Sequence, residues 1–285
     1  MKTFQEDLDE FLKKYPYDTI DVDGVTYDYI LTGAKNRPVL VGFNGLEMQE
    51  MWIKYAEELA DEYGFLIFKY PLELKTNEEQ ARGLHKLLEK LSIQKPILCG
   101  ASDGGIHAQK YIRMYPDEVS GLILATTVSL NSEYAKRFRK IKWMMPLMNF
   151  KLKHKKWESM KQQLITMAEG YFNDETAEEQ AYGHTFFETI FATEAYRAQY
   201  IHSMVLLADM LGNDDFLPEE FAALDGKVLL LHPEKDIFSA EDQNALTSLF
   251  KNPEVHKMVG GHLAFVMRYP EYIELIRAFL SKLEV

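Results

Sequence analysis

The sequence predicts an α/β fold with a mainly parallel sheet of eight, or seven, strands flanked by helices. Short apolar runs alternate with segments of helical periodicity, as expected for strands that helices bury on both faces. A two-residue turn pattern near the start predicts an additional antiparallel hairpin. The composition, with 47% hydrophobic and 27% charged residues, is ordinary for a folded globular chain.

The strands can be assigned in chain order. Asp23-Gly24 joins two alternating segments, 19–22 and 25–31, and this dipeptide favours a tight hairpin turn with which the chain is expected to open. Continuous apolar runs then indicate buried parallel strands at 38–43, 65–70, 96–100, 119–125 and 228–232. A shorter strand is expected near the end, at 255–259.

Helical periodicity marks several of the segments between these strands. Thr76 and Glu79 have the spacing of a capping box, which predicts the start of a helix. Leucines then recur at i, i+3, i+4 and i+7 on its expected buried face, at Leu84, Leu87, Leu88 and Leu91. Further helices are expected at 240–250 and 270–283.

Strand signals stop after residue 125 and helical patterns replace them for about ninety residues. One helix face is expected to carry Trp157, Met160, Leu164, Ala168 and Tyr171. A second helix-rich stretch spans 176–211. The sequence therefore predicts a helical cap, residues 127–213, inserted into an α/β core domain formed by residues 1–126 and 214–285.

Charge and segment composition exclude several classes of function. The 32 Lys and Arg residues against 44 Asp and Glu residues give a net charge of −12, which disfavours binding to nucleic acid. No apolar stretch is long enough to span a bilayer, and the acidic start does not resemble a signal peptide. The single cysteine, Cys99, fits a reducing compartment. We expect a cytoplasmic protein without a transmembrane segment, either a monomer or a homodimer.

The segment Gly100-Ala101-Ser102-Asp103-Gly104 matches the pattern G-x-S-x-G. It lies between a predicted strand and a predicted helix, which is the setting of a nucleophile elbow. In such a turn the glycines leave room for a strained backbone and the serine hydroxyl is exposed at the end of the sheet. Ser102 is therefore the candidate nucleophile.

A serine nucleophile needs a histidine to accept its proton and a carboxylate to orient that histidine. His262 follows Gly260-Gly261 after the last strand and is favoured over His256, which lies within that strand. Asp236 follows the strand at 228–232 and is favoured over Asp242, which lies where a helix is expected to start. The candidate triad is Ser102, Asp236 and His262.

With these residues in this order, the chain resembles the α/β-hydrolase superfamily. The resemblance rests on 100–115, on Glu234-Lys235-Asp236-Ile237-Phe238 and on Gly260-Gly261-His262, and it covers nearly the whole chain. Within the superfamily, Ala108-Gln109-Lys110 and Trp143-Met144-Met145-Pro146 resemble the maspardin branch, which implies a non-catalytic binding protein that lacks the final histidine. This chain retains His262, which favours catalysis.

Acyl transfer also needs amide donors for the developing oxyanion. One candidate is the amide of Asp103, directly after the nucleophile. The other is expected in the loop after the strand at 38–43, where the family often has His-Gly and this chain has Val41-Gly42-Phe43-Asn44-Gly45-Leu46. Aligning Gly42 with the family glycine makes Phe43 the donor, which we slightly prefer, whereas aligning Gly45 makes it Leu46.

The sequence thus predicts a serine hydrolase, most simply an esterase that cleaves a small or acyl ester through an acyl-enzyme. Other chemistries that use the same triad, including C–C bond and amide hydrolysis, stay open, as does a non-catalytic binding or scaffold protein. No metal or organic cofactor is implied. A serine at position 102 argues against the dehalogenase and epoxide hydrolase types, which use an aspartate there.

The predicted cap combines basic and apolar residues. Residues 136–156 contain no acid and nine cations, namely Lys136, Arg137, Arg139, Lys140, Lys142, Lys151, Lys153, Lys155 and Lys156. Interleaved aromatic and methionine side chains suit either an anionic amphiphile or membrane surface, or a solvated helix with an apolar underside. We expect the substrate to be a small molecule with an apolar or anionic acyl group.

Overall fold

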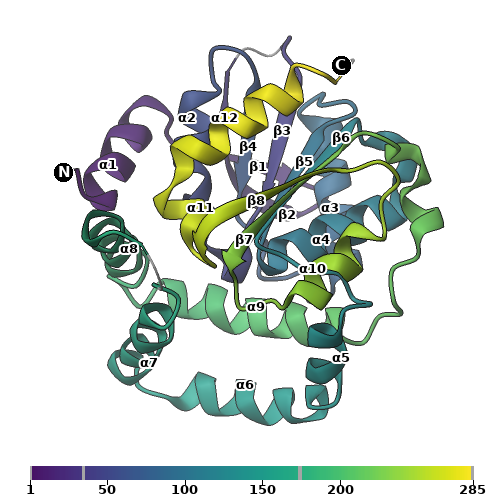
Figure 1. The fold of residues 1–285 in the computed structure, drawn as a ribbon. Coiled ribbons are helices and arrows are strands. Elements are labelled where there is room, and N and C mark those ends of the chain that lie inside the picture. The colour runs from purple at the N-terminus through teal and green to yellow at the C-terminus, as the bar shows by residue number, and fades with distance from the viewer. Residues whose placement is uncertain (1, 34–35, 173–174, 284–285) are drawn as a thin grey trace.

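The computed structural model describes residues 2–33, 36–172 and 175–283 and contains one eight-stranded sheet (Figure 1). The strands are β1 (Asp18–Val22), β2 (Val25–Thr32), β3 (Val39–Phe43), β4 (Gly64–Phe68), β5 (Ile97–Ala101), β6 (Gly121–Ala125), β7 (Val228–Lys235) and β8 (Glu254–Gly261). Their order is β1-β2-β4-β3-β5-β6-β7-β8. Strands β1 and β2 pair antiparallel, β2 also pairs antiparallel with β4, and the others are parallel. The predicted α/β class is confirmed.

Helices cover both faces of the sheet because successive side chains of each parallel strand enter opposite cores. Leu40 belongs to the core on one face, which includes residues of α2 (Ile53–Glu58), α11 (Ala264–Met267) and α12 (Tyr269–Leu280). Val41 belongs to the core on the other face, which includes residues of α3 (Asn77–Lys90), α4 (Asp103–Met114) and α10 (Ala240–Thr247). Alternation of this kind explains why the strands appear in the sequence as continuous apolar runs rather than as alternating ones.

Local sequence signals fix several element ends. Thr76 and Glu79 form the predicted capping box at the start of α3, and Leu84, Leu87 and Leu88 of this helix are buried. The turn between β1 and β2 has positive φ at Asp23 (54°) and Gly24 (85°), which is the geometry that an Asp-Gly turn adopts readily.

Five α-helices lie between β6 and β7 in the residues that the structure describes, where the sequence predicts helices, and we call them the cap helices. They are α5 (Glu133–Arg139), α6 (Met145–His154), α7 (Trp157–Glu169), α8 (Ala177–Ile190) and α9 (Tyr196–Met210). Figure 1 shows α6, α7 and α9 grouped on one side of the sheet. No helix in the described chain has the length and apolar character needed to cross a bilayer.

A helix that the sequence analysis did not predict, α1 (Phe4–Lys14), precedes the hairpin. Its residue Asp7 accepts a hydrogen bond from the hydroxyl of Tyr182 in α8 (2.9 Å) and pairs with Lys54 of α2 (3.0 Å). Phe4 packs edge-on against Phe186 of α8. Helix α1 therefore links a cap helix to a helix that covers the sheet.

Candidate active site

Ser102 lies between β5 and α4 in a strained turn. Its φ of 53° and ψ of −132° are unusual for a residue with a side chain. The turn also needs glycines, because a Cβ at position 100 would lie 2.5 Å from the Cα of Gly105 and one at position 104 would lie 2.3 Å from the carbonyl oxygen of Phe43. The G-x-S-x-G pattern thus has a steric cause in this structure.

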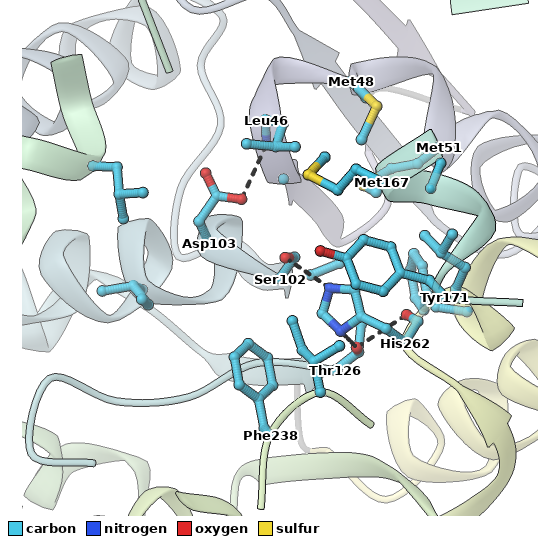
Figure 2. Close-up of a pocket in the computed structure, with 18 of the residues that line it drawn as sticks. Leu46, Met48, Met51, Ser102, Asp103, Thr126, Met167, Tyr171, Phe238 and His262 are labelled. Carbon is cyan, nitrogen blue, oxygen red and sulfur yellow. Dashed lines mark hydrogen bonds between the residues drawn. The ribbon is translucent and has the colours of Figure 1, made fainter. Parts of the chain in front are cut away.

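The last sheet strand brings His262 to the serine. His262 follows β8, and its Nε2 lies 3.1 Å from the hydroxyl oxygen of Ser102 (Figure 2). Gly260, the penultimate residue of β8, has a φ of 100°, which bends the end of the strand just before His262. Glu175, which lies shortly before α8, accepts a hydrogen bond from the amide of Gly261 at 2.8 Å, so a group from outside the sheet holds the end of β8.

Asp236 completes a continuous row of hydrogen-bonding groups. It follows β7, its side chain is 1% exposed, and its Oδ1 lies 2.7 Å from His262 Nδ1. With the proton on Nδ1 donated to this carboxylate, Nε2 has a lone pair directed at the Ser102 hydroxyl. The arrangement can therefore remove a proton from the serine and hold the resulting imidazolium.

The alternative residues lie elsewhere. His256 contacts Glu254 at 2.9 Å within β8. Asp242 caps the start of α10 through Ser239 and accepts a hydrogen bond from the amide of Tyr134 at 2.8 Å. Neither residue lines the cavity that contains Ser102.

Thr126, which the sequence analysis did not identify, contacts two members of this row. Its hydroxyl oxygen lies 2.7 Å from His262 Nδ1, 3.1 Å from Asp236 Oδ2 and 3.0 Å from the His262 carbonyl oxygen. The hydroxyl can share the Nδ1 proton with Asp236 while donating its own hydrogen to one of the two oxygens. The only signal in the sequence is a polar residue placed directly after β6.

The loop after β3 passes over the nucleophile. A Cβ at position 45 would lie 2.8 Å from the Cβ of Ser102, and Leu46 lines the same cavity. The amide of Leu46 donates a hydrogen bond to Asp103 Oδ1 at 3.0 Å (Figure 2). Phe43 does not line this cavity, and its buried ring packs against Phe68 and Tyr111 instead.

Two consecutive left-handed residues give this loop its shape, and cap helix α9 holds both of them. Leu46 has a φ of 49° and Glu47 a φ of 56°, which is uncommon for residues with side chains. The hydroxyl of Tyr196 donates to the Leu46 carbonyl at 2.6 Å. His202 Nδ1 lies 2.6 Å from Glu47 Oε1, and its Nε2 donates to the Leu74 carbonyl at 2.8 Å.

Burial changes the acidity of the carboxyl groups in this loop region. Burial raises the pKa of Asp103 to about 6, against the opposing effect of hydrogen bonds from the amides of Leu46 and Asp103 itself. Burial likewise raises the pKa of Glu47 to about 7, although His202 opposes the rise. His107 Nε2 lies 3.9 Å from Asp103 Oδ2; burial lowers the pKa of His107 to about 4, so this imidazole is neutral at pH 7.

The serine opens into a cavity of about 300 Å³. Side chains from four cap helices form much of its wall: Tyr134 and Phe138 of α5, Met167 of α7, Phe187 of α8, and Met204 and Leu207 of α9. Tyr171, just after α7, and Phe191, directly after α8, also line it. Phe238 and Tyr171 also flank the His262 ring, with ring centroids 5.4 and 5.5 Å away. The cavity is suited to an apolar group held next to the serine.

No protein-family model matches the chain, and no curated protein matches it in sequence. Solved structures do resemble it. A thermophilic esterase from Thermogutta terrifontis matches with a TM-score of 0.72 and 21% identity over 94% of this chain and 99% of the other. MGS-M2, an α/β-hydrolase enzyme from a deep-sea metagenome of the Medee basin, matches with a TM-score of 0.73 and 18% identity, over 94% of this chain and 98% of that one.

The enol-lactonase from Burkholderia xenovorans is similar to the same extent. Its TM-score is 0.73, with 15% identity over 93% of this chain and the whole of that one. At these identities the likeness shows a common fold, and it extends over nearly the full length of each protein.

Proposed function

We propose that this chain, which has the α/β-hydrolase fold, is a serine hydrolase that cleaves esters with an apolar acyl group. The observation that carries the proposal is the row of contacts from Ser102 through His262 to Asp236, at 3.1 and 2.7 Å, at the edge of an apolar cavity. The esterase and enol-lactonase among its structural neighbours support the same class of reaction.

The proposed reaction has two stages. The Ser102 oxygen bonds to the ester carbonyl carbon as its proton moves to His262 Nε2, and the tetrahedral intermediate then loses the alcohol, which takes that proton. Water attacks the acyl-enzyme by the same route and releases the acid. Asp236 holds the imidazolium throughout, and Thr126 holds both Asp236 and the imidazole.

For the oxyanion we propose the amides of Asp103 and Leu46, in place of Phe43. Leu46 borders the cavity next to Ser102, whereas Phe43 is in the core of the sheet. The Leu46 amide is bonded to the Asp103 carboxylate, so the substrate carbonyl has to replace that oxygen. Protonation of Asp103, or a turn of its side chain, frees the amide for this role.

A fluorophosphonate probe tests the proposal without a known substrate. We expect one adduct per chain on Ser102, located by mass spectrometry, and its loss in Ser102→Ala. We expect slow labelling in His262→Ala, because the base is removed, and normal labelling in the control Ser281→Ala, an exposed serine after α12.

Circular dichroism of each variant separates a chemical effect from unfolding. No adduct on folded wild-type protein would overturn the hydrolase proposal and favour a binding protein with this fold. A different result would be labelling of Ser102 in a protein that hydrolyses amides or C–C bonds but no acyl ester. Ser102 would then still be the nucleophile, but the proposed ester substrate would be wrong.

A further inference from the structure

The outer side of the cap carries a cluster of exposed apolar side chains. Six of the eleven large hydrophobic residues that are exposed in the described chain lie within residues 141–150, and we call these six the outer cap face: Ile141, Trp143, Met144, Leu147, Met148 and Phe150. Trp143 is 75% exposed, Phe150 60% and Leu147 58%. Leu147 and Phe150 lie one turn apart on α6, and Trp143 lies in a short 3-10 helix, Lys142–Met144, directly before α6; we call these three residues the apolar stripe.

The outer cap face has no role in the proposed active site. Helix α6 contributes no residue to the wall of the Ser102 cavity. It is attached through Met145, which is buried with Ala135 and Leu211, and through the partly buried Leu152. Figure 1 shows α6 running along the margin of the molecule, outside α9. The exposed side chains are therefore additional to what holds the helix in place.

Cations flank the apolar stripe along the chain. Among the nine Lys and Arg residues of 136–156, Lys136 pairs with Glu133 and Arg139 with Asp215. The other seven form no ion pair with an acid in the parts of the chain that the structure describes, and all but Lys155 are exposed: Arg137, Lys140, Lys142, Lys151, Lys153, Lys155 and Lys156. In a chain of net charge −12, this is a local reversal of sign.

We infer that the outer cap face binds the surface of an anionic lipid membrane. Apolar side chains of a helix lying in the interface enter the boundary between headgroups and acyl chains, while flanking cations contact lipid phosphates. Both parts are present here, with Trp143, Leu147 and Phe150 on the apolar stripe and Lys151 and Lys153 beside it.

Other occupants fit the same surface less well. A two-fold contact between two copies through this face would bring two sets of unpaired cations together. Nucleic acid would satisfy the cations but would leave the aliphatic side chains of Ile141, Leu147 and Met148 without a matching apolar surface. A lipid surface matches both the charge and the apolar character.

The outer cap face lies, along the chain, between two helices that line the Ser102 cavity. The helices before and after this face, α5 and α7, contribute Phe138 and Met167 to the cavity wall. A membrane bound to the outer cap face would therefore lie next to two elements that enclose the cavity. Membrane binding does not depend on the proposed chemistry, and it can be measured whether or not Ser102 reacts.

Trp143 provides a built-in probe, because the other two tryptophans are buried, with Trp52 at 1% and Trp157 at 8% exposure. We expect the full chain to sediment with vesicles of equal parts phosphatidylcholine and phosphatidylglycerol, but not with phosphatidylcholine alone. Tryptophan emission should shift to shorter wavelength on binding, and Trp143→Phe should remove the shift. Raising the salt concentration should weaken the binding.

Two double variants test the two parts of the surface. Leu147→Ser/Phe150→Ser and Lys151→Gln/Lys153→Gln should each weaken vesicle binding about tenfold or more. The control Val255→Ser/Val259→Ser, which changes exposed apolar residues of β8 instead, should bind as the wild type does. Thermal melts establish that each variant is folded.

Four results would overturn the inference. One is no binding to the anionic vesicles by folded wild-type protein. Another is binding that neither double variant changes. The third is self-association, seen by analytical ultracentrifugation without lipid, that Leu147→Ser/Phe150→Ser abolishes; a second copy would then be the occupant. The fourth is binding to a DNA duplex as strong as binding to the anionic vesicles, abolished by Lys151→Gln/Lys153→Gln but not by Leu147→Ser/Phe150→Ser; nucleic acid would then be the occupant.

Discussion

The Leu46 amide donates a 3.0 Å hydrogen bond to the carboxylate of Asp103, the residue directly after Ser102. The bond connects the loop after β3 with the residue that follows the nucleophile. In the proposed mechanism the Asp103 carboxylate lies where an ester substrate would develop negative charge, and it occupies one of the two amides that we propose as oxyanion donors. The protonation state of Asp103 therefore bears on both stability and activity.

We predict that Asp103→Asn stabilises the protein at pH 8 and has little effect at pH 4. The folded-state pKa of Asp103, about 6, lies above the ordinary 3.8. A raised carboxyl pKa contributes stability that is complete below the unfolded pKa and is lost as pH rises through the folded pKa. The difference between the two proteins should thus grow by roughly 3 kcal/mol at most between pH 4 and 7.

Urea denaturation at several pH values measures this difference. Asparagine keeps an acceptor for the Leu46 amide, so the loop contact is retained. A stability difference that does not vary with pH would show that the Asp103 carboxyl carries no such cost.

Thr126→Val should lower kcat about tenfold with little change in KM. Valine has nearly the shape of threonine but removes the hydroxyl that contacts His262 Nδ1 and Asp236 Oδ2. A loss of one contact to a buried charged group corresponds to about 1.5 kcal/mol or more. Thr126→Ser, which retains the hydroxyl, should recover most of the rate. Equal rates for the valine and serine variants would contradict a positioning role for the hydroxyl.

Tyr196→Phe should lower kcat about fivefold without changing KM, because Tyr196 does not line the cavity but holds the Leu46 carbonyl at 2.6 Å. The matched control is Tyr182→Phe, which removes a cap hydrogen bond of similar length to Asp7. It should destabilise the protein to a similar degree and leave kcat unchanged. A parallel fall in kcat for both would point to a general loss of cap structure.

The apolar cavity predicts a preference for acyl length. Each buried methylene contributes about 0.8 kcal/mol, so kcat/KM should rise about fourfold per methylene from acetyl esters until the cavity is filled. Met204→Trp, which reduces the cavity from the α9 side, should move the optimum to shorter chains. The measurement is a series of nitrophenyl esters. Equal kcat/KM for acetyl and longer esters would reject an acyl-binding role for the cavity.

The sheet and the positions of Ser102, Asp236 and His262 after their strands could be predicted from the sequence, because they depend on local patterns. Continuous apolar runs indicate buried strands, and a glycine-flanked serine between strand and helix indicates a tight turn. The carboxyl ends of parallel neighbours then lie at one edge of the sheet. The catalytic roles of these residues stay predictions.

Contacts between distant segments could not be predicted in this way. Thr126 lies 136 residues from His262 in sequence, and Tyr196 lies 150 from Leu46. The slight preference for Phe43 over Leu46 depended on aligning Gly42 with the family glycine. The structure instead bends the chain at Leu46 and Glu47, two residues in a conformation that their side chains disfavour. Tyr196 and His202 of α9 hold that bend, and no pattern in the loop sequence itself points to these contacts.

Helix α1 has a consequence for how the cap can move. Asp7 contacts α8 on one side and α2 on the other, so a hinge motion that separates these two helices has to break a buried ion pair and a hydrogen bond at the same residue. Through Asp7, these contacts hold α8 to α2. Any opening of the cap that moves α8 away from α2 therefore costs both contacts at once.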